Sequence, residues 1–398
     1  TAWILTSTAL VLFMTLPGLA LFYCGLVNSK NVVSVLMQHF ALACVVSIIW
    51  VTIGYSLAFS TGNAWIGDLS NLFMKSITLD SISGTIPESL FASFQMTFAI
   101  ITPALIIGAF VERIKFSAML IFLSLWVIIV YLPVTHWVWG GGLLSSWGVM
   151  DFAGGIVVHA TAGTAALVTA LTLGKRRGFP KSITPPHSPI LTMIGAAMLW
   201  VGWFGFNAGS ALGANSSAGM AMLVTHISAA TAALVWMFIE WKRFGKPSLI
   251  GAVTGMVAGL ATVTPASGYI GIPGGLILGF LGGLLCYLAV DYIRGKLQID
   301  DSLDVFAVHG VGGILGSLLV AFLATSTFLG LGLPEGQTAS SQFIIQFKGV
   351  ALTICWTAVF TYLILKLTSF IVPLRVEEEE EIEGLDLRSH GEKGYHSD

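Results

Sequence analysis

Residues 116–135 read FSAMLIFLSLWVIIVYLPVT and contain no charged side chain. A helix needs about 20 mostly apolar residues to cross the hydrocarbon core of a bilayer. Transmembrane β-strands are shorter and alternate between apolar and polar residues, and this run does not alternate. The stretch therefore predicts a membrane-spanning α-helix.

Similar apolar runs recur along the whole chain, and they predict an all-α polytopic membrane protein with eleven transmembrane helices. The runs lie near 2–27, 32–59, 88–111, 116–135, 152–173, 189–208, 217–240, 248–265, 272–293, 304–326 and 341–372. Because eleven is odd, the two ends of the chain are expected on opposite sides of the membrane.

The charge content supports the same class. Only 10% of the 398 residues are charged, whereas soluble proteins carry about a quarter. This scarcity excludes a soluble enzyme, a nucleic-acid binder and a disordered scaffold. The four cysteines all lie in apolar runs without paired spacing, so we interpret them as packing residues; they are Cys24, Cys44, Cys286 and Cys355. No motif predicts a metal, a cofactor or catalysis.

Lysine and arginine are distributed unevenly between the loops. The loops after the odd-numbered predicted helices hold 12 of them, and the loops after the even-numbered helices, up to the tenth, hold only Lys75. Basic loops stay in the cytoplasm. We therefore expect the N-terminus outside and the C-terminus inside, with the protein in the cell (inner) membrane.

Two predicted helices share a pattern, which suggests an internal repeat. One begins Asp151-Phe-Ala-Gly-Gly-Ile-Val-Val-His159 and the other Asp301-Ser-Leu-Asp-Val-Phe-Ala-Val-His309. Each has an aspartate and, eight residues on, a histidine followed by small residues. Two five-helix halves must have opposite topology, since five is odd. Inversion would bring the two histidines together near the membrane centre.

His159 and His309 are the first candidates for function. A lone histidine in a membrane helix is most often satisfied by a backbone carbonyl, but two at matched positions favour a functional pair. Two close imidazoles cannot both be charged cheaply, so they are expected to share a proton through a hydrogen bond. Such a pair could exchange hydrogen bonds with a small substrate or relay a proton.

Other candidates have an equally good structural interpretation. Asp151 could cap a helix or attract a cation electrostatically at the outer mouth. Trp139, in a Trp-rich segment before three glycines, could anchor to lipid or hold a cation by cation–π attraction. Phe94 and Phe98 share one helix face. Phe206 and Ser210 lie in the segment Trp203-Phe-Gly-Phe-Asn-Ala-Gly-Ser210, and Ser210 is a plausible polar acceptor.

The segment 373–398 is acidic, with five glutamates in a row from Glu377 to Glu381. It could be a solvated disordered end. It could also dock on the basic inner loops or bind a soluble regulatory partner.

Taken with these motifs, the chain resembles the ammonium transporters of the Amt/Mep/Rh superfamily, on its bacterial Amt branch. The resemblance runs from Leu12-Phe-Met-Thr-Leu-Pro-Gly-Leu-Ala-Leu-Phe-Tyr23 to Ser389-His-Gly-Glu392. It implies two inverted five-helix repeats (about 1–173 and 189–326), a bracing eleventh helix (about 341–372) and a cytoplasmic tail (373–398). It also implies a homotrimer with one pore per subunit, and control by a PII-type signalling protein.

The resemblance also implies site roles. Ammonium, or methylammonium as an analogue, would bind at Trp139, Phe98 and Ser210 with Phe94 nearby, and Phe98 with Phe206 would stack as a gate. His159 and His309 would be the twin histidines of the pore. Asp151 would be an essential acid that shapes the site.

Two alternative functions remain open. A Rh-type gas channel shares the fold, but Trp139 and the segment that contains Phe206 argue against it. An ammonium sensor is the second alternative, and the absence of a fused signalling domain in this sequence argues against that. The favoured interpretation is a transporter or channel that recruits ammonium and conducts ammonia, with or without its proton, past the histidines.

Overall fold

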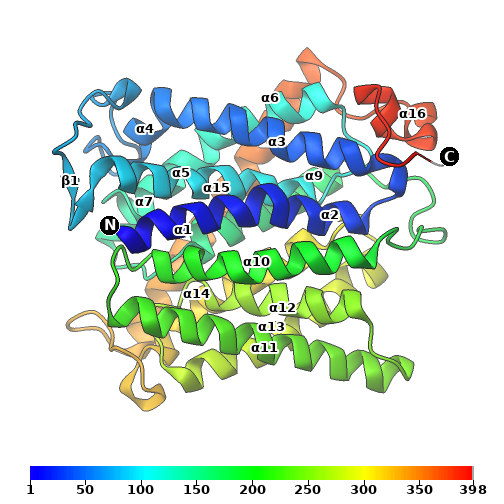
Figure 1. Ribbon diagram of the computed structural model, residues 1–398. Helices are drawn as coiled ribbons and strands as arrows, with labels where there is room; N and C mark the ends of the chain where they lie inside the picture. The colour runs from blue at the N-terminus through cyan, green and yellow to red at the C-terminus, as the bar shows by residue number, and fades with distance from the viewer. Residues whose placement is uncertain (397–398) are drawn as a thin grey trace.

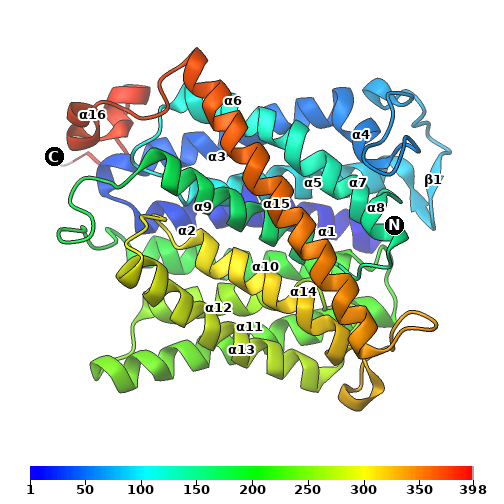
Figure 2. The same ribbon diagram turned by 180° about the vertical axis from the view of Figure 1, so that it is seen from behind.

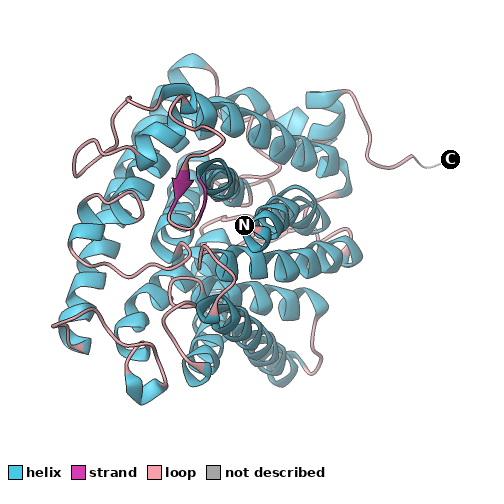
Figure 3. Cartoon of the chain, turned by 60° about the vertical axis from the view of Figure 1, so that its left-hand side comes forward, coloured by secondary structure: helices cyan, strands magenta, loops and turns pink. Residues whose placement is uncertain are grey.

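The computed structural model describes residues 1–396, so the last two residues of the expected tail lie outside the described part. The described chain is a bundle of long helices that run roughly side by side (Figure 1). The N-terminus lies at one end of the bundle and the C-terminal helix α16 at the other. Figure 3 shows the bundle partly along the helix axes, and the described helices pack against one another without a sheet layer.

The first half of the chain contains one short hairpin and a series of helices. The strands β1 (Ile82–Ser83) and β2 (Ile86–Pro87) pair antiparallel at the N-terminal end of the bundle. The helices are α1 (Ala2–Phe13), η1 (Met14–Leu19), α2 (Ala20–Leu26), η2 (Ser29–Asn31), α3 (Val32–Ile49), η3 (Trp50–Gly54), α4 (Tyr55–Phe59), η4 (Leu72–Met74), α5 (Glu88–Ile107), α6 (Phe116–Trp126), η5 (Val127–Tyr131), α7 (Leu132–Val138), α8 (Leu143–Ser146), η6 (Gly155–Ala160) and α9 (Thr161–Leu173).

The second half is helical in all its regular elements. These are α10 (Pro189–Gly209), α11 (Ser216–Phe244), α12 (Leu249–Val263), α13 (Ile272–Val290), η7 (Asp291–Lys296), η8 (Phe306–Gly310), α14 (Val311–Leu323), η9 (Ser326–Phe328), α15 (Ala339–Ile371), α16 (Glu378–Glu383) and η10 (Asp386–His390). Several elements join end to end into one long helix, for example η6 with α9 and η8 with α14.

Ten continuous helices in the described residues are long and apolar enough to cross a membrane, where the sequence predicted eleven. The exception is the segment predicted near 248–265, which forms the 15-residue helix α12. At 1.5 Å per residue it spans about 22 Å, less than the hydrocarbon core of about 30 Å. Helix α12 ends two residues before Pro265, and the chain continues in buried turns over 264–269. The count of eleven apolar segments holds, but one is too short to span as a helix alone.

The two halves are related by inversion, as the packing of their first helices illustrates. Helix α10 runs antiparallel to α1 and α2: a Cβ added at Gly209 would meet Ser7, and one added at Gly202 would meet Met14. Further along the same contact, one added at Gly195 would meet Phe22. The fold is thus an all-α polytopic membrane fold of two inverted five-helix repeats with an eleventh helix, α15, which crosses the bundle diagonally over α9 and α14 (Figure 2).

The acidic segment after α15 is docked onto the bundle. Glu381 accepts hydrogen bonds from the Arg177 backbone N–H (2.8 Å) and from the Arg375 guanidinium (2.7 Å). The Asp386 carboxylate accepts from the Ser34 backbone N–H at 2.8 Å, near the start of α3. The described residues of this segment agree with docking on the basic loops, since Lys115 and Arg177 both contact its glutamates.

Candidate functional site

The histidine-bearing helices begin in the same way in both halves. The two carboxylate oxygens of Asp151 accept four backbone N–H groups, from Gly154 through Val157, at 2.6–3.1 Å. In the second half, Asp301 accepts the backbone N–H of Phe306 at 2.7 Å. Both aspartates are buried, and each precedes a π-helical turn that carries a histidine. The shared sequence pattern therefore specifies a shared helix start.

The two histidines are in contact, as the inverted repeat predicted. Nδ1 of His309 lies 3.3 Å from Nδ1 of His159, and the ring planes are 19° apart. Both residues are buried. One Nδ1 must donate and the other accept, so a single hydrogen is held between them. The Nε2 of His159 has no hydrogen-bond partner among the described residues, and it is free to exchange a hydrogen bond with a small molecule.

A cavity of about 400 Å³ opens at the N-terminal end of the bundle, and we call it the outer cavity. Half of the described residues that line it are aromatic, and none is charged: Phe59, Ser83, Phe91, Gln95, Phe98, Val138, Trp139, Phe152, Ser210 and Leu212. The Ser210 hydroxyl donates to the Phe206 carbonyl at 2.8 Å, which leaves its oxygen lone pairs available as acceptors. Aromatic faces with neutral acceptors suit a small cation.

A series of aromatic rings connects the outer cavity to the histidine pair. Trp139 packs edge-on against Phe98 with ring centroids 5.7 Å apart, and Phe98 lies 4.4 Å from Phe206. Phe206 is 6.0 Å from His159, and its ring is nearly parallel to the imidazole. The planes of Phe98 and Phe206 are tilted by 39°, so the expected stacked pair is a tilted contact.

Phe94 lies next to Phe98, one turn away on α5. It is fully buried, packs on Phe98 at 5.1 Å, and is not among the described residues that line the outer cavity. The helical spacing of i and i+4 puts both rings on one side of α5, but only Phe98 reaches the cavity. Phe94 packs against the Phe98 ring and helps to hold it at the cavity wall.

Asp151 acts as a capping residue in this structure. Among the described residues, its carboxylate accepts from four backbone N–H groups of the following turn, and its side chain is not part of the outer cavity lining. Its backbone carbonyl accepts a hydrogen bond from Nε1 of Trp139 at 2.9 Å. Asp151 therefore joins the aromatic wall of the outer cavity to the helix that carries His159.

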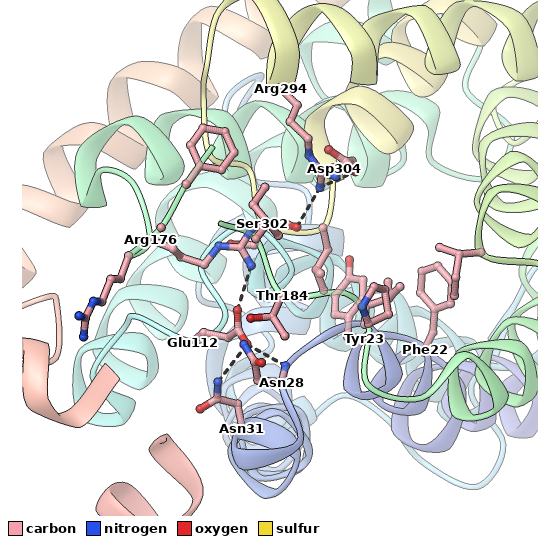
Figure 4. A pocket seen from close by; sticks show the side chains of 18 of the residues that line it. Phe22, Tyr23, Asn28, Asn31, Glu112, Arg176, Thr184, Arg294, Ser302 and Asp304 are labelled. Atoms are coloured by element: carbon pink, nitrogen blue, oxygen red, sulfur yellow. Dashed lines mark hydrogen bonds and ion pairs between the residues drawn. The ribbon is translucent and has the colours of Figure 1, made fainter. Parts of the chain in front are cut away.

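A second cavity, the inner cavity, lies at the opposite end and has a volume of about 430 Å³. His309 and Val308 contribute to its lining, so the histidine pair borders it directly. Polar side chains also line it, among them Arg294, which pairs with Asp304 at 3.0 Å (Figure 4). Two separate cavities thus approach the bundle centre from the two ends, with the aromatic rings and histidines between them.

An ionic cluster forms one wall of the inner cavity. Arg176 pairs with Glu112 and with Asp300, each at 2.9 Å (Figure 4 shows the Glu112 pair). Burial raises the pKa of the Glu112 carboxyl, but Arg176 and the N–H groups of Asn28 and Asn31 more than offset burial, and the net pKa is lowered. The pKa of Asp300 is lowered in the same way, with Arg176 as the main opposing charge. The cluster is held in its charged form.

Gln95 also lines the outer cavity, and the sequence motifs did not predict it. Its side chain lines the outer cavity one turn from Phe98 and Phe91, and its Oε1 has no hydrogen-bond partner among the described residues. A buried acceptor without a partner costs about 1–3 kcal/mol. The sequence feature that could have indicated Gln95 is its amide on the aromatic face of the helix at 88–107. A face that serves only for packing would be apolar.

Among residues 1–396, no group of His, Cys, Asp and Glu could hold a metal ion, and all four cysteines are free thiols. The site therefore consists of aromatic rings, neutral polar groups and two imidazoles. Such an arrangement can bind a small cation, strip it of water and offer hydrogen bonds to a neutral molecule that passes the histidine pair.

Comparisons with known proteins identify the family of the chain. The sequence profile of the Ammonium Transporter Family matches residues 2–395. The chain is 47% identical over 402 residues to the "Putative ammonium transporter" of Methanothermobacter thermautotrophicus, covering 99% of this chain and 98% of that protein. It is also 47% identical over 400 residues to the "Ammonium transporter" of Aquifex aeolicus, covering 99% of this chain and 93% of that protein. A solved structure titled "Sensor Amt Protein" matches with a TM-score of 0.91 at 29% identity, covering 98% of this chain and 97% of that one.

Proposed function

The chain belongs to the ammonium transporter family, and from this premise we propose that it recruits ammonium at the outer cavity and conducts ammonia, with or without the proton, past His159 and His309. The observation that carries the proposal is the contact of the two histidines between two cavities, one of which His309 lines. We keep the proposed roles of Trp139, Phe98 and Ser210 in binding ammonium. Phe94 is proposed to support Phe98, against which it packs.

The first step is recruitment of the cation. Moving a charge into the membrane interior is costly, by several kcal/mol or more. The faces of Trp139 and Phe98 attract a cation, and the Ser210 oxygen accepts one of its N–H groups. Among the described residues, no charged side chain lines the outer cavity, so the site would favour a small hydrogen-bonding cation without binding it irreversibly.

The second step is passage of the neutral molecule. The tilted rings of Phe98 and Phe206 close the direct route at 4.4 Å between centroids, so they would have to move to open it. Beyond them, the histidine pair offers both donors and acceptors in a buried setting. Ammonia, which both donates and accepts hydrogen bonds, matches that pair, whereas a hydrated metal ion does not.

Transport measurements test the proposal directly. Proteoliposomes containing the protein should respond to an ammonium concentration jump with saturable uptake, and methylammonium should compete. A non-saturable flux unaffected by methylammonium would instead support the Rh-type gas channel. The electrical current that accompanies uptake would report whether the proton follows.

A sensor function is the second candidate, because the chain resembles a structure titled "Sensor Amt Protein". Expression in a strain that lacks ammonium uptake discriminates the two functions. A transporter restores growth on low ammonium at acid pH, and a protein that only reports ammonium does not.

The remaining expectations extend this proposal. We propose a transporter domain over 1–372 and a cytoplasmic tail over 373–398, a homotrimer in the inner membrane, and an outside N-terminus. The basic loops and the acidic docked segment lie at the same end of the bundle, which supports that orientation. The same end would meet a PII-type partner. Because archaeal and bacterial relatives are equally similar, the bacterial branch is favoured only by the sequence motifs.

A further inference from the structure

Helix α15 buries a row of polar side chains although its outward side is apolar. The buried polar residues of α15 are Gln342, Gln346, Thr353, Thr357, Thr361 and Thr368. Figure 2 shows this helix crossing α9 and α14, the helices that continue from the two histidines. Polar groups inside a membrane protein are costly unless they are paired, so each buried amide needs an explanation.

Gln346 is the most completely bonded of these residues. Its Oε1 accepts the Met150 backbone N–H at 2.7 Å, and its Nε2 donates to the Met150 carbonyl at 2.8 Å. The same Nε2 donates to the Ser317 carbonyl at 2.7 Å. Gln342 donates to the amide oxygen at 3.1 Å, so both hydrogens and both lone pairs of the amide are used. These partners fix which end of the amide is oxygen.

The bonded residues belong to the path described above. Met150 immediately precedes Asp151, whose carbonyl holds Trp139 and whose carboxylate caps the turn that carries His159. Ser317 lies on α14, eight residues after His309. One amide on α15 thus contacts the corner before the first histidine helix and the helix that continues from the second histidine.

We infer that Gln346 is a positioning residue for transport: it clamps the Met150–Asp151 corner against α14 and thereby sets Trp139 and the His159 turn relative to His309. This inference rests on the proposed function, and it goes beyond a bracing role for α15. A helix that only covered the bundle would need apolar contacts. The clamp uses an amide, whose oxygen accepts from the N–H of Met150 while its NH₂ group donates to the carbonyls of Met150 and Ser317.

The test replaces Gln346 with methionine, which keeps the length of the side chain and removes every hydrogen bond. Gln342→Met is a milder variant, since it removes the bond to Gln346 and the bond to the Gly148 carbonyl. Thr357→Val is the matched control, because Thr357 is buried on the same helix and its hydroxyl has no partner among the described residues. Each variant is purified, checked for folding by thermal melting, and assayed for methylammonium uptake in proteoliposomes.

We expect Q346M to raise the half-saturating concentration about tenfold, Q342M to raise it less, and T357V to leave it at the wild-type value. A purely structural role would lower the melting temperature but leave the half-saturating concentration of the folded protein unchanged. That outcome, in Q346M or in Q342M if Q346M does not fold, overturns the inference.

Amide hydrogen exchange provides a readout that does not depend on transport. The amides of Met150 and of Gly155–Val157 should exchange faster in Q346M or Q342M than in T357V. If wild-type protein transports nothing, the proposed function fails, while faster exchange would still establish the clamp. Unchanged exchange at these amides would show that Gln346 does not hold the corner, and the inference would be wrong even in a working transporter.

Discussion

Nδ1 of His309 lies 3.3 Å from Nδ1 of His159, although the two residues are 150 positions apart. Each histidine lies in a π-helical turn, and the helices that carry them pack closely through glycines. Gly163 lies against Gly310 with no room for a side chain between them. The contact is therefore a product of both repeats, since each contributes one imidazole and one close glycine.

Replacing either histidine leaves the other ring buried without its partner. We expect His309→Leu to reduce methylammonium uptake at least about tenfold, because an unpaired buried polar group costs about 1–3 kcal/mol and the hydrogen-bond relay is interrupted. Initial uptake rates in proteoliposomes measure the loss. His226→Gln is the control, since His226 is exposed on α11. If both His159→Ala and His309→Ala kept wild-type flux and selectivity, the paired histidines would have no role.

Gly313 is required by the close approach of the two histidine helices. A Cβ at this position would lie 2.5 Å from the Cβ of His159 and 2.7 Å from the Gly155 carbonyl oxygen. Overpacking of this kind costs about 1–3 kcal/mol. Gly313→Ala should therefore lower both the melting temperature and the uptake rate.

Gly219→Ala provides the comparison, because a Cβ added there on α11 meets no atom within 4 Å. It should leave the melting temperature unchanged or raise it slightly, since alanine favours helix. Equal melting temperatures for the two variants would mean that the helices can separate without cost.

Gln95 offers a neutral amide to the outer cavity, and its carboxamide can turn to present oxygen to a cation. We expect Gln95→Leu to raise the half-saturating ammonium concentration by up to about tenfold with little change in the maximal rate, because a ligand hydrogen bond is lost before the rate-determining passage. Competition of ammonium with labelled methylammonium measures this.

The control is Gln38→Leu. Gln38 is also a buried amide with an unpartnered Oε1 among the described residues, but it does not line the outer cavity. A similar rise in both variants would assign the effect to general stability.

The ion pairs of Arg176 with Glu112 and Asp300 predict that the folded protein loses stability at acid pH. The pKa values of Glu112 and Asp300 are lower in the folded protein than in the unfolded chain, where they are about 4. Their stabilisation is therefore present above about pH 4 and is lost as the pH falls through the folded-state pKa values. Arg176→Gln removes the ion-pair partner of Glu112 and the closer of two arginines at Asp300, where Arg113 remains at 3.7 Å, and should cost about 3 kcal/mol at neutral pH.

The sign of the pH dependence should change in that variant. Without Arg176, burial is the largest influence on Glu112 and should raise the pKa of this carboxyl, while Arg113 still pairs with Asp300, so the contribution of Glu112 to stability should increase as the pH falls from neutral. Melting curves in detergent between about pH 4 and pH 8 test this. The exposed pair of Arg243 and Asp291 is the control, and Arg243→Gln should shift the curve little at any pH. If Arg176→Gln had the same pH profile of stability as the wild type, the ion pairs of Arg176 would not contribute to stability.

The sequence by itself determined the class of the protein, the positions of the apolar segments and the inverted relationship of the two histidines. These follow from hydrophobic length, from loop charge and from an Asp-to-His spacing of eight residues, and such features depend on neighbours along the chain. Ten of the eleven segments are long helices, and α12 is shorter because the chain breaks near Pro265.

Only the tertiary structure decided which side of each helix faces a cavity. It placed Gln95 in the wall of the outer cavity and packed Phe94 against Phe98, and it made Asp151 a cap for four backbone N–H groups. It also brought Gln346 of α15 to Met150, 196 residues away in the chain. In a sequence that is apolar on nearly all helix faces, hydrophobic periodicity carries little information on rotation. Helix packing, set largely by where glycines allow close approach, decides it.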